Sequence, residues 1–348
     1  MIIRNNIETL VNIKGKGISS LEEYIEKAEE MTLNWTDRHL VGESRFPLTI
    51  TDEMKVEYQD SIGEWRASDI SEYAFTQLCG KVGVPASYIS KCFDKGMGEL
   101  AVHNFNEWSR KIEGAQDLLV REYEGTVRAV LSDRYNVFNT ASVMKNVKQA
   151  LDAPQYAGRY ELNQIFLNPD KLHMRFVDFN SPLKIGNREY TPGFTISSSD
   201  VGSGSLNIKY FIYRFACRNG LVIVKNGGTL FRQTHLGDFE SAGADLFMKA
   251  LENVDAMNQY AADKLVCLQN KMLSREEMNL YLTRAQKELH LGKGKAMENL
   301  NDLLNETYSE GNILSFINAI TENAQKYTLE TRIEHEIWAG NVLSNISA

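Results

Sequence analysis

Apolar residues recur along the last third of the chain at the spacing of a helix. From Leu246 to Met272 they follow one another at intervals of three or four residues, on one stripe of a helix of about 30 residues. Ser274 and Glu277 have the spacing of a capping box, which predicts the start of another helix. Further helices are expected over 294–307, 311–325 and 328–345. The pattern therefore predicts an all-helical C-terminal region.

The middle of the chain alternates between apolar and polar residues, as strands do. Two such runs, 118–123 and 126–131, flank Glu124-Gly125, a pair typical of a tight hairpin turn. A helix is expected over about Thr140–Leu151. The remaining runs predict strands over 160–167, 172–177, 190–197, 206–216, 221–224 and 229–232, the last two joined across Asn226-Gly227-Gly228.

The first part of the chain mixes helices with a short strand. Ser19-Ser20 precedes a capped amphipathic helix, a strand is expected over 54–58, and helices over 69–81, 85–95 and 97–112. The helices that meet at Gly83 have the spacing of a helix-turn-helix, whose second helix would enter the major groove. Only one of its exposed residues is basic, which favours a packed helical corner; these residues are Ser87, Tyr88, Ser90 and Lys91.

These elements predict an α+β fold, with a central mixed, mostly antiparallel β-sheet, flanking helices and an all-helical C-terminal part. We divide the chain into an N-terminal α+β region, a central β-rich core, and a helical C-terminal region packed on the core, over 1–114, 115–240 and 241–348. The apolar stripe of the 240–272 helix is typical of packing within the chain. A homo-oligomer formed through this helix is the alternative.

Composition is ordinary for a globular protein, with 43% hydrophobic and 24% charged residues. The four cysteines, at 79, 92, 217 and 267, form no CxxC pair and lie among apolar residues, so we expect buried free thiols in a reducing cytoplasm. No apolar run approaches the roughly 18–20 residues of a membrane span. We therefore expect a cytoplasmic protein with no membrane partner.

Charge is unevenly distributed along the chain. The net charge is −8, but residues 115–240 carry 15 Lys and Arg against 12 Asp and Glu, a net of +3. The rest of the chain carries a net of −11. A mildly basic middle between acidic flanks is compatible with an anionic partner for the predicted sheet.

Sequence motifs of known catalytic chemistry are absent. The chain contains no GxxxxGK[ST], HExxH or GxSxG motif. Gly202-x-Gly204 precedes a predicted strand, so it lacks the helix N-terminus that a phosphate cradle uses. We expect no catalytic residues, no metal and no cofactor. A hydrolase or nuclease with a site assembled from distant residues stays an alternative.

Two clusters carry residue types that bind nucleic acid. Arg134 and Tyr135 follow a strand and offer a charge beside a stacking ring, although Asp133 and Asn136 around them are also typical of a turn. The strand from Leu206 interleaves basic and aromatic residues: Lys209, Tyr213, Arg214 and, in the next turn, Arg218. Arg214 falls on an apolar face, where it needs an anionic partner, either a carboxylate of the fold or a bound phosphate.

Several segments resemble the phage/plasmid-like protein family, a family of unknown function from bacteriophages, prophages and plasmids. They are FTQLCGKVGVPASYISKC (75–92), SDRYN (132–136), DVGSGSLNI (200–208) with YRFACRNGL (213–221), and AGNVL (339–343). The resemblance covers most of the chain from about residue 70. It implies a mobile-element protein in the bacterial cytoplasm and supplies no catalytic residues.

The mildly basic middle of the chain, its interleaved basic and aromatic residues and the family resemblance lead to one functional hypothesis and one alternative. The hypothesis is a non-enzymatic nucleic-acid-binding accessory protein of phage or plasmid DNA metabolism, acting on single- or double-stranded DNA. Its site would consist of Arg134, Tyr135, Lys209, Tyr213, Arg214 and Arg218. The alternative is a protein-binding antagonist of a bacterial host system, such as a defence system, with a host protein as partner.

Overall fold

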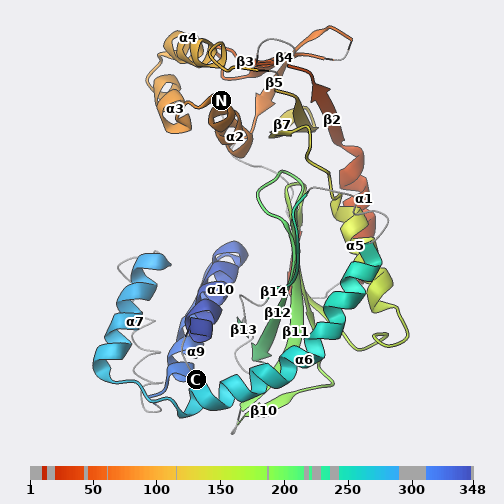
Figure 1. Cartoon of the computed structure of the whole chain (residues 1–348), viewed down its shortest axis with the longest axis vertical. Coiled ribbons are helices and arrows are strands. Elements are labelled where there is room, and N and C mark those ends of the chain that lie inside the picture. Colours follow the sequence, from red (N-terminus) through yellow and green to blue (C-terminus); the bar gives the residue numbers. More distant parts are fainter. Residues whose placement is uncertain are drawn as a thin grey trace.

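Two lobes, each built around its own β-sheet, make up the described part of the chain (Figure 1). This computed structural model describes residues 10–13, 20–42, 46–60, 62–114, 116–185, 188–214, 219–221, 229–235, 243–289 and 311–345. The α+β class predicted from the sequence is confirmed, and so is the helical C-terminal part. Within these ranges, no helix combines the length and apolar character that crossing a membrane requires.

The smaller lobe contains a six-stranded sheet in the order β2-β6-β7-β5-β4-β3. Its pairs are antiparallel except for β5 with β7, which is parallel. The predicted hairpin is confirmed, because Glu124 and Gly125 both have positive φ, as a tight turn between twisted strands requires. The strands are β2 (Trp35–Leu40), β3 (Leu48–Ile50), β4 (Val56–Gln59), β5 (Trp65–Ile70), β6 (Leu118–Tyr123) and β7 (Thr126–Ser132).

Three helices cover this sheet: α2 (Glu72–Val82), α3 (Ala86–Asp94) and α4 (Gly98–Ser109). Gly83 ends α2 in the left-handed conformation, with φ of 83°. Phe75, Leu78, Ile89 and Phe105 are fully buried in one core with the sheet. The Tyr88 hydroxyl accepts a hydrogen bond of 2.7 Å from the Asn104 amide, which ties α3 to α4. This arrangement is the packed helical corner that the sequence favours.

The larger lobe contains an eight-stranded antiparallel sheet in the order β1-β8-β9-β11-β12-β13. β10 pairs with β11, and β14 pairs with β12. β13 and β14 follow one another along the same strand, β12, and β14 confirms the strand predicted over 229–232. Of the strand predicted over 221–224, only Leu221 is described, as the end of β13, and the turn predicted at 226–228 lies outside the described residues. The strands are β1 (Leu10–Ile13), β8 (Glu161–Asn168), β9 (Lys171–Val177), β10 (Leu183–Ile185), β11 (Arg188–Ser199), β12 (Leu206–Arg214), β13 (Asn219–Leu221) and β14 (Thr229–Gln233).

One face of the larger sheet is the main apolar core. α1 (Leu21–Leu33), α5 (Thr140–Leu151) and α6 (Gly243–Asn270) lie on this face (Figure 1). Ile196 and Ile208 of the sheet, for example, line one small apolar cavity with Val147 of α5 and Phe247 of α6. The predicted α6 stripe therefore packs within the chain. Oligomerisation through α6 stays a prediction.

The opposite face of the larger sheet is next to α9 (Ile313–Asn323) and α10 (Leu329–Asn345), with α7 (Arg275–Glu288) beyond them (Figure 1). α9 is buried on nearly all sides, since every residue from Ile313 to Thr321 is buried. The capping box that begins α7 is confirmed, with Ser274 and Glu277 bonding each other's backbone. The predicted 294–307 helix lies outside the described residues.

Candidate nucleic-acid interface

The tip of the hairpin between β11 and β12 joins the two lobes. Gln77 of α2 donates to the Val201 carbonyl at 2.9 Å, and Arg121 of β6 donates to the Asp200 carbonyl at 2.6 Å. Gly202 has φ of 77°, and a Cβ there would lie 2.6 Å from the Leu131 side chain. The Gly/Ser-rich stretch is therefore packed against the smaller lobe, consistent with the sequence argument against a phosphate cradle.

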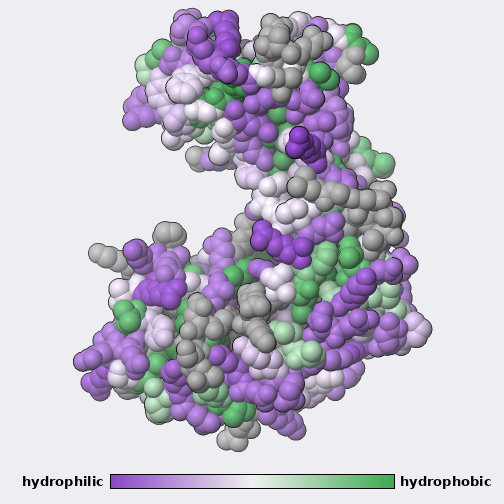
Figure 2. All heavy atoms as spheres, viewed as in Figure 1, coloured by the Kyte–Doolittle hydropathy of each residue, from purple (hydrophilic) through white to green (hydrophobic). Residues whose placement is uncertain are grey.

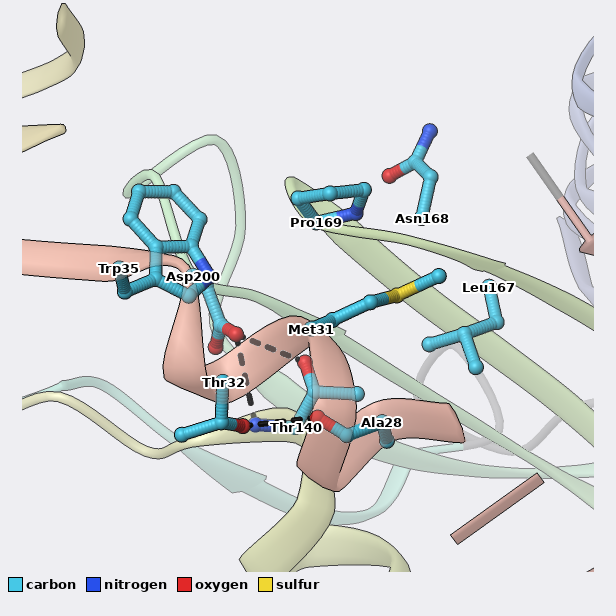
Figure 3. A pocket seen from close by; sticks show the side chains of 9 residues that line it. All are labelled: Ala28, Met31, Thr32, Trp35, Thr140, Leu167, Asn168, Pro169 and Asp200. Carbon is cyan, nitrogen blue, oxygen red and sulfur yellow. Dashed lines mark hydrogen bonds between the residues drawn. The ribbon is translucent and has the colours of Figure 1, made fainter. Parts of the chain in front are cut away.

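Asp200 is buried in this junction, and Figure 3 shows it above α1 beside Thr140 and Trp35. Its Oδ2 accepts hydrogen bonds from the Thr140 hydroxyl (2.9 Å) and backbone amide (3.3 Å). Burial raises the pKa of the Asp200 carboxyl to about 6, although the Arg121 charge and the Thr140 bonds oppose the rise. The adjoining cavity, of about 10 Å³, has room for roughly one water molecule.

Arg134 and Tyr135 lie next to this junction. Arg134 is exposed, whereas the Tyr135 hydroxyl donates to the Ser199 carbonyl at 3.0 Å. The Tyr135 ring stacks on His235 with a centroid separation of 4.7 Å, and burial raises the pKa of its hydroxyl. His235 stacks in turn on Phe138. The Tyr135 ring therefore has contacts within the fold, with His235 and with the apolar cluster that contains Leu131 and Val201.

The other predicted residues lie on or after β12. Lys209 is half-buried on the face away from the apolar core. Tyr213 and Arg214 belong to the β12 backbone, but their side chains lie outside the described part, as does Arg218 altogether. Backbone pairing places Arg214 opposite Tyr190, ten residues of extended chain from Asp200, or about 33 Å. Asp200 is therefore too distant to be the anionic partner of Arg214.

Cross-strand pairing arranges the face around Lys209 in polar rows. Residues directly opposite one another in antiparallel strands share a face of the sheet. One row runs Gln164, Arg175, Thr195, Lys209 across β8, β9, β11 and β12. The next runs His173, Ser197, Asn207, Arg232 across β9, β11, β12 and β14, and beyond it Lys171 pairs with Ser199. We call this set the polar face.

Cations dominate the accessible end of the polar face. Lys171 and Arg232 are exposed and Lys209 is half-buried. Burial, together with the nearby Arg232 charge, lowers the pKa of the Lys209 ammonium. Arg232 donates to the Ser205 hydroxyl at 3.1 Å, which orients its guanidinium along the sheet. Figure 2 shows the molecule hollowed between the two lobes, on the side of the sheet where α10 lies in Figure 1.

Buried polar groups continue the polar face beneath α10. Arg175 is 2% exposed, lies over the Phe211 ring at 4.8 Å and pairs with Glu336 of α10. Glu336 also accepts from Arg332 at 3.1 Å. Burial and the charges of Arg175, Lys209 and Arg332 lower the pKa of His173 to about 3, so its imidazole is neutral.

Lys209 was predicted from the sequence, whereas Lys171, His173, Arg175 and Arg232 were not. A local signal was present, because polar Lys171, His173 and Arg175 alternate with apolar Leu172 and Met174. Their neighbours across the sheet depend on strand pairing, which the sequence does not display.

A second open region lies on the smaller lobe, between α4 and strands β3 and β4. This groove of about 580 Å³ is rich in acidic residues, and His103 and Arg110 are its basic members. Arg110 pairs with Glu107 within it. The acidic lining consists of Asp52, Glu57, Glu99 and Glu107. The acidic side chains of this groove repel nucleic acid. The surfaces described on the two lobes are therefore opposite in charge.

In the described ranges, no group of three or more His, Cys, Asp or Glu side chains is arranged to hold a metal ion. Cys79 and Cys92 are free and buried, as predicted, Cys267 is free and half-buried, and Cys217 lies outside the described residues.

Comparison with known proteins places the chain in a family without an assigned activity. No curated protein and no solved structure matches it. A family model described as a domain of unknown function, DUF932, matches residues 127–342, from β7 to the last turns of α10. This match includes every strand of the polar face and both helices beside it. The chain belongs to the DUF932 family.

Proposed function

We propose that this protein is a nucleic-acid-binding protein that takes a DNA strand along the polar face of its larger sheet. The cations Lys209, Arg232 and Lys171 lie in three successive rows of the polar face, beside hydroxyl and amide side chains, and support the proposal most directly. Cations neutralise backbone phosphates, and Ser, Thr and Asn side chains donate to phosphate oxygens. A sheet face that is accessible from one side suits single-stranded nucleic acid. The bases of a single strand are unpaired, so they are free to contact side chains of the sheet.

The biological setting belongs to the same proposal. The resemblance to phage/plasmid-like proteins suggests an accessory role in phage or plasmid DNA metabolism, without catalysis, in the bacterial cytoplasm. Arg134 is exposed and lies next in the chain to Tyr135, which bonds the hairpin tip, and it stays a predicted member of the site. Arg214 and Arg218 stay predicted members of the site.

Fluorescence anisotropy with a labelled 30-nucleotide oligo(dT) tests the proposal. The unaltered chain is compared with Lys171→Ala/Lys209→Ala/Arg232→Ala and with the control Lys91→Ala/Lys95→Ala, which removes exposed charges of the smaller lobe. We expect the triple variant to lose about 100-fold in affinity, or about 1 kcal/mol for each cation, and the control less than threefold. Equal affinities for all three chains would refute the polar face as the site.

A protein-binding antagonist of a bacterial host system is the second candidate. The observations in its favour are the acidic groove and, on other sides of α4, the exposed side chains of Leu100 and Trp108. Aromatic side chains ringed by charge are typical of protein interfaces. A stoichiometric host protein captured from bacterial lysate by the unaltered chain, and lost with Trp108→Ala, would support this candidate. Capture unchanged by Trp108→Ala would count against the exposed side of α4 that carries Trp108 as the interface.

A further inference from the structure

α10 lies against the polar face through a buried ion group. Glu336 is 1% exposed and holds Arg175 of β9 on one side and Arg332, one turn earlier on α10, on the other. The Arg175 and Glu336 side chains come from positions 161 residues apart. This group therefore links the helical C-terminal part directly to the sheet.

Within the part of the chain that the structure describes, several polar atoms around this ion group are buried without hydrogen-bond partners. On the sheet they are Arg175 Nε and Nη1, both amide atoms of Gln164 and His173 Nε2; on α10, His335 Nδ1 has none either. Gln164, Arg175 and His173 are 0%, 2% and 8% exposed. Each of these groups bonds water when it is uncovered. The contact between α10 and the sheet forfeits such bonds at Arg175 and at His335, so this polar part of the contact contributes less stability than its buried area suggests.

Glu336 has the chemistry of the ligand proposed for the same face. A carboxylate between guanidinium groups presents anionic oxygens as a phosphate does, and Arg binds both groups in the same way. Arg175 shares its row with Lys209, and the next row carries Arg232. A DNA strand following the exposed cations would reach Arg175 only if Glu336 moved away.

We infer that α10 is an autoinhibitory cover, in which Glu336 occupies the place of a strand phosphate on Arg175 and binding of DNA displaces the helix. The inference rests on the proposed function and adds regulation to that site. The apparent affinity for DNA is then the affinity of the uncovered protein multiplied by the fraction of molecules in which α10 is displaced. A partner or modification that holds α10 away would increase DNA binding.

The test compares Glu336→Gln with Glu334→Gln in the full chain. Glu334 is exposed on the same helix two residues away, so the control makes the same change in net charge. Glu336→Gln is expected to bind the oligo(dT) about tenfold more tightly than the control, because it weakens the closed state. Equal affinity of the two variants would overturn the inference.

Hydrogen exchange of the unaltered chain gives a second test that does not depend on how Glu336→Gln folds. Saturating oligo(dT) is expected to speed amide exchange in residues 329–345, since a displaced helix is less protected. Unchanged or slower exchange there, with oligo(dT) bound, would overturn the cover and leave the proposed function standing. Absence of oligo(dT) binding by the unaltered chain and by both variants would instead refute the proposed function.

Discussion

Replacing Asp200 by asparagine tests how the junction between the two lobes is stabilised. The carboxyl is 4% exposed, and burial raises its pKa from 3.8 to about 6. The folded protein therefore keeps a proton on Asp200 over a range of pH in which the unfolded chain has released it. A state that binds more protons is favoured at low pH, so this group makes the protein less stable as pH rises from about 4 to 6.

The size of this effect follows from the two pKa values. The interval from 3.8 to about 6 corresponds to about 3 kcal/mol in the free energy of unfolding. About 1.4 kcal/mol of that is lost between pH 5 and pH 7.5. Asparagine has no charge to titrate, and its side-chain oxygen can accept the two Thr140 hydrogen bonds.

Urea unfolding of the unaltered chain and Asp200→Asn at pH 5.0, 6.0 and 7.5 measures the difference. We expect the stability of the variant relative to the unaltered chain to increase by about 1.4 kcal/mol over this range. Other titrating groups are common to both chains and cancel. Asp94→Asn, at an exposed carboxylate of α3, is the control for the loss of one carboxylate from the chain. A difference between Asp200→Asn and the unaltered chain that does not change with pH would refute the reasoning.

The remaining predictions concern the backbone of the hairpin tip and a helix cap. Gly202→Ala should destabilise the protein by about 1–2 kcal/mol in urea unfolding, because φ is 77° at this position. Gly204→Ala, with open space around the added Cβ, is the control and should be nearly neutral. Equal losses of stability in the two variants would contradict this prediction. Ser274→Ala should cost about 1 kcal/mol by removing the α7 cap, and an unchanged unfolding midpoint would show that the cap does not contribute.

Local sequence signals accounted for much of the fold. Ser20 caps α1, Glu124-Gly125 forms the hairpin turn and Ser274 begins α7, each through bonds between close neighbours in the chain. The division into two sheets was not predictable in this way. β2 and β5 are polar and largely exposed, so they lack the alternation that identifies a half-buried strand. The parallel pairing of β5 with β7 joins segments more than 50 residues apart.

The residues of the candidate site were even harder to predict from the sequence than the division into two sheets. Lys209 could be proposed from its own strand, but its neighbours Arg175 and Arg232 come from β9 and β14 and are assembled only by the register of the sheet. Tyr135 was predicted as a stacking residue, and its ring does stack, on His235 of the same chain. A motif of charge and ring cannot distinguish an internal partner from a nucleobase, because both offer the same contact.

The salt dependence of oligo(dT) binding tests the central claim most directly. Three cations on single-stranded DNA predict a slope of log K against log salt of about −2, or about 20-fold weaker binding at 200 mM than at 50 mM salt. The Lys171→Ala/Lys209→Ala/Arg232→Ala variant should lose most of that slope, and Lys91→Ala/Lys95→Ala should keep it. A slope near zero for the unaltered chain, or an undiminished slope for the triple variant, would contradict DNA binding on the polar face.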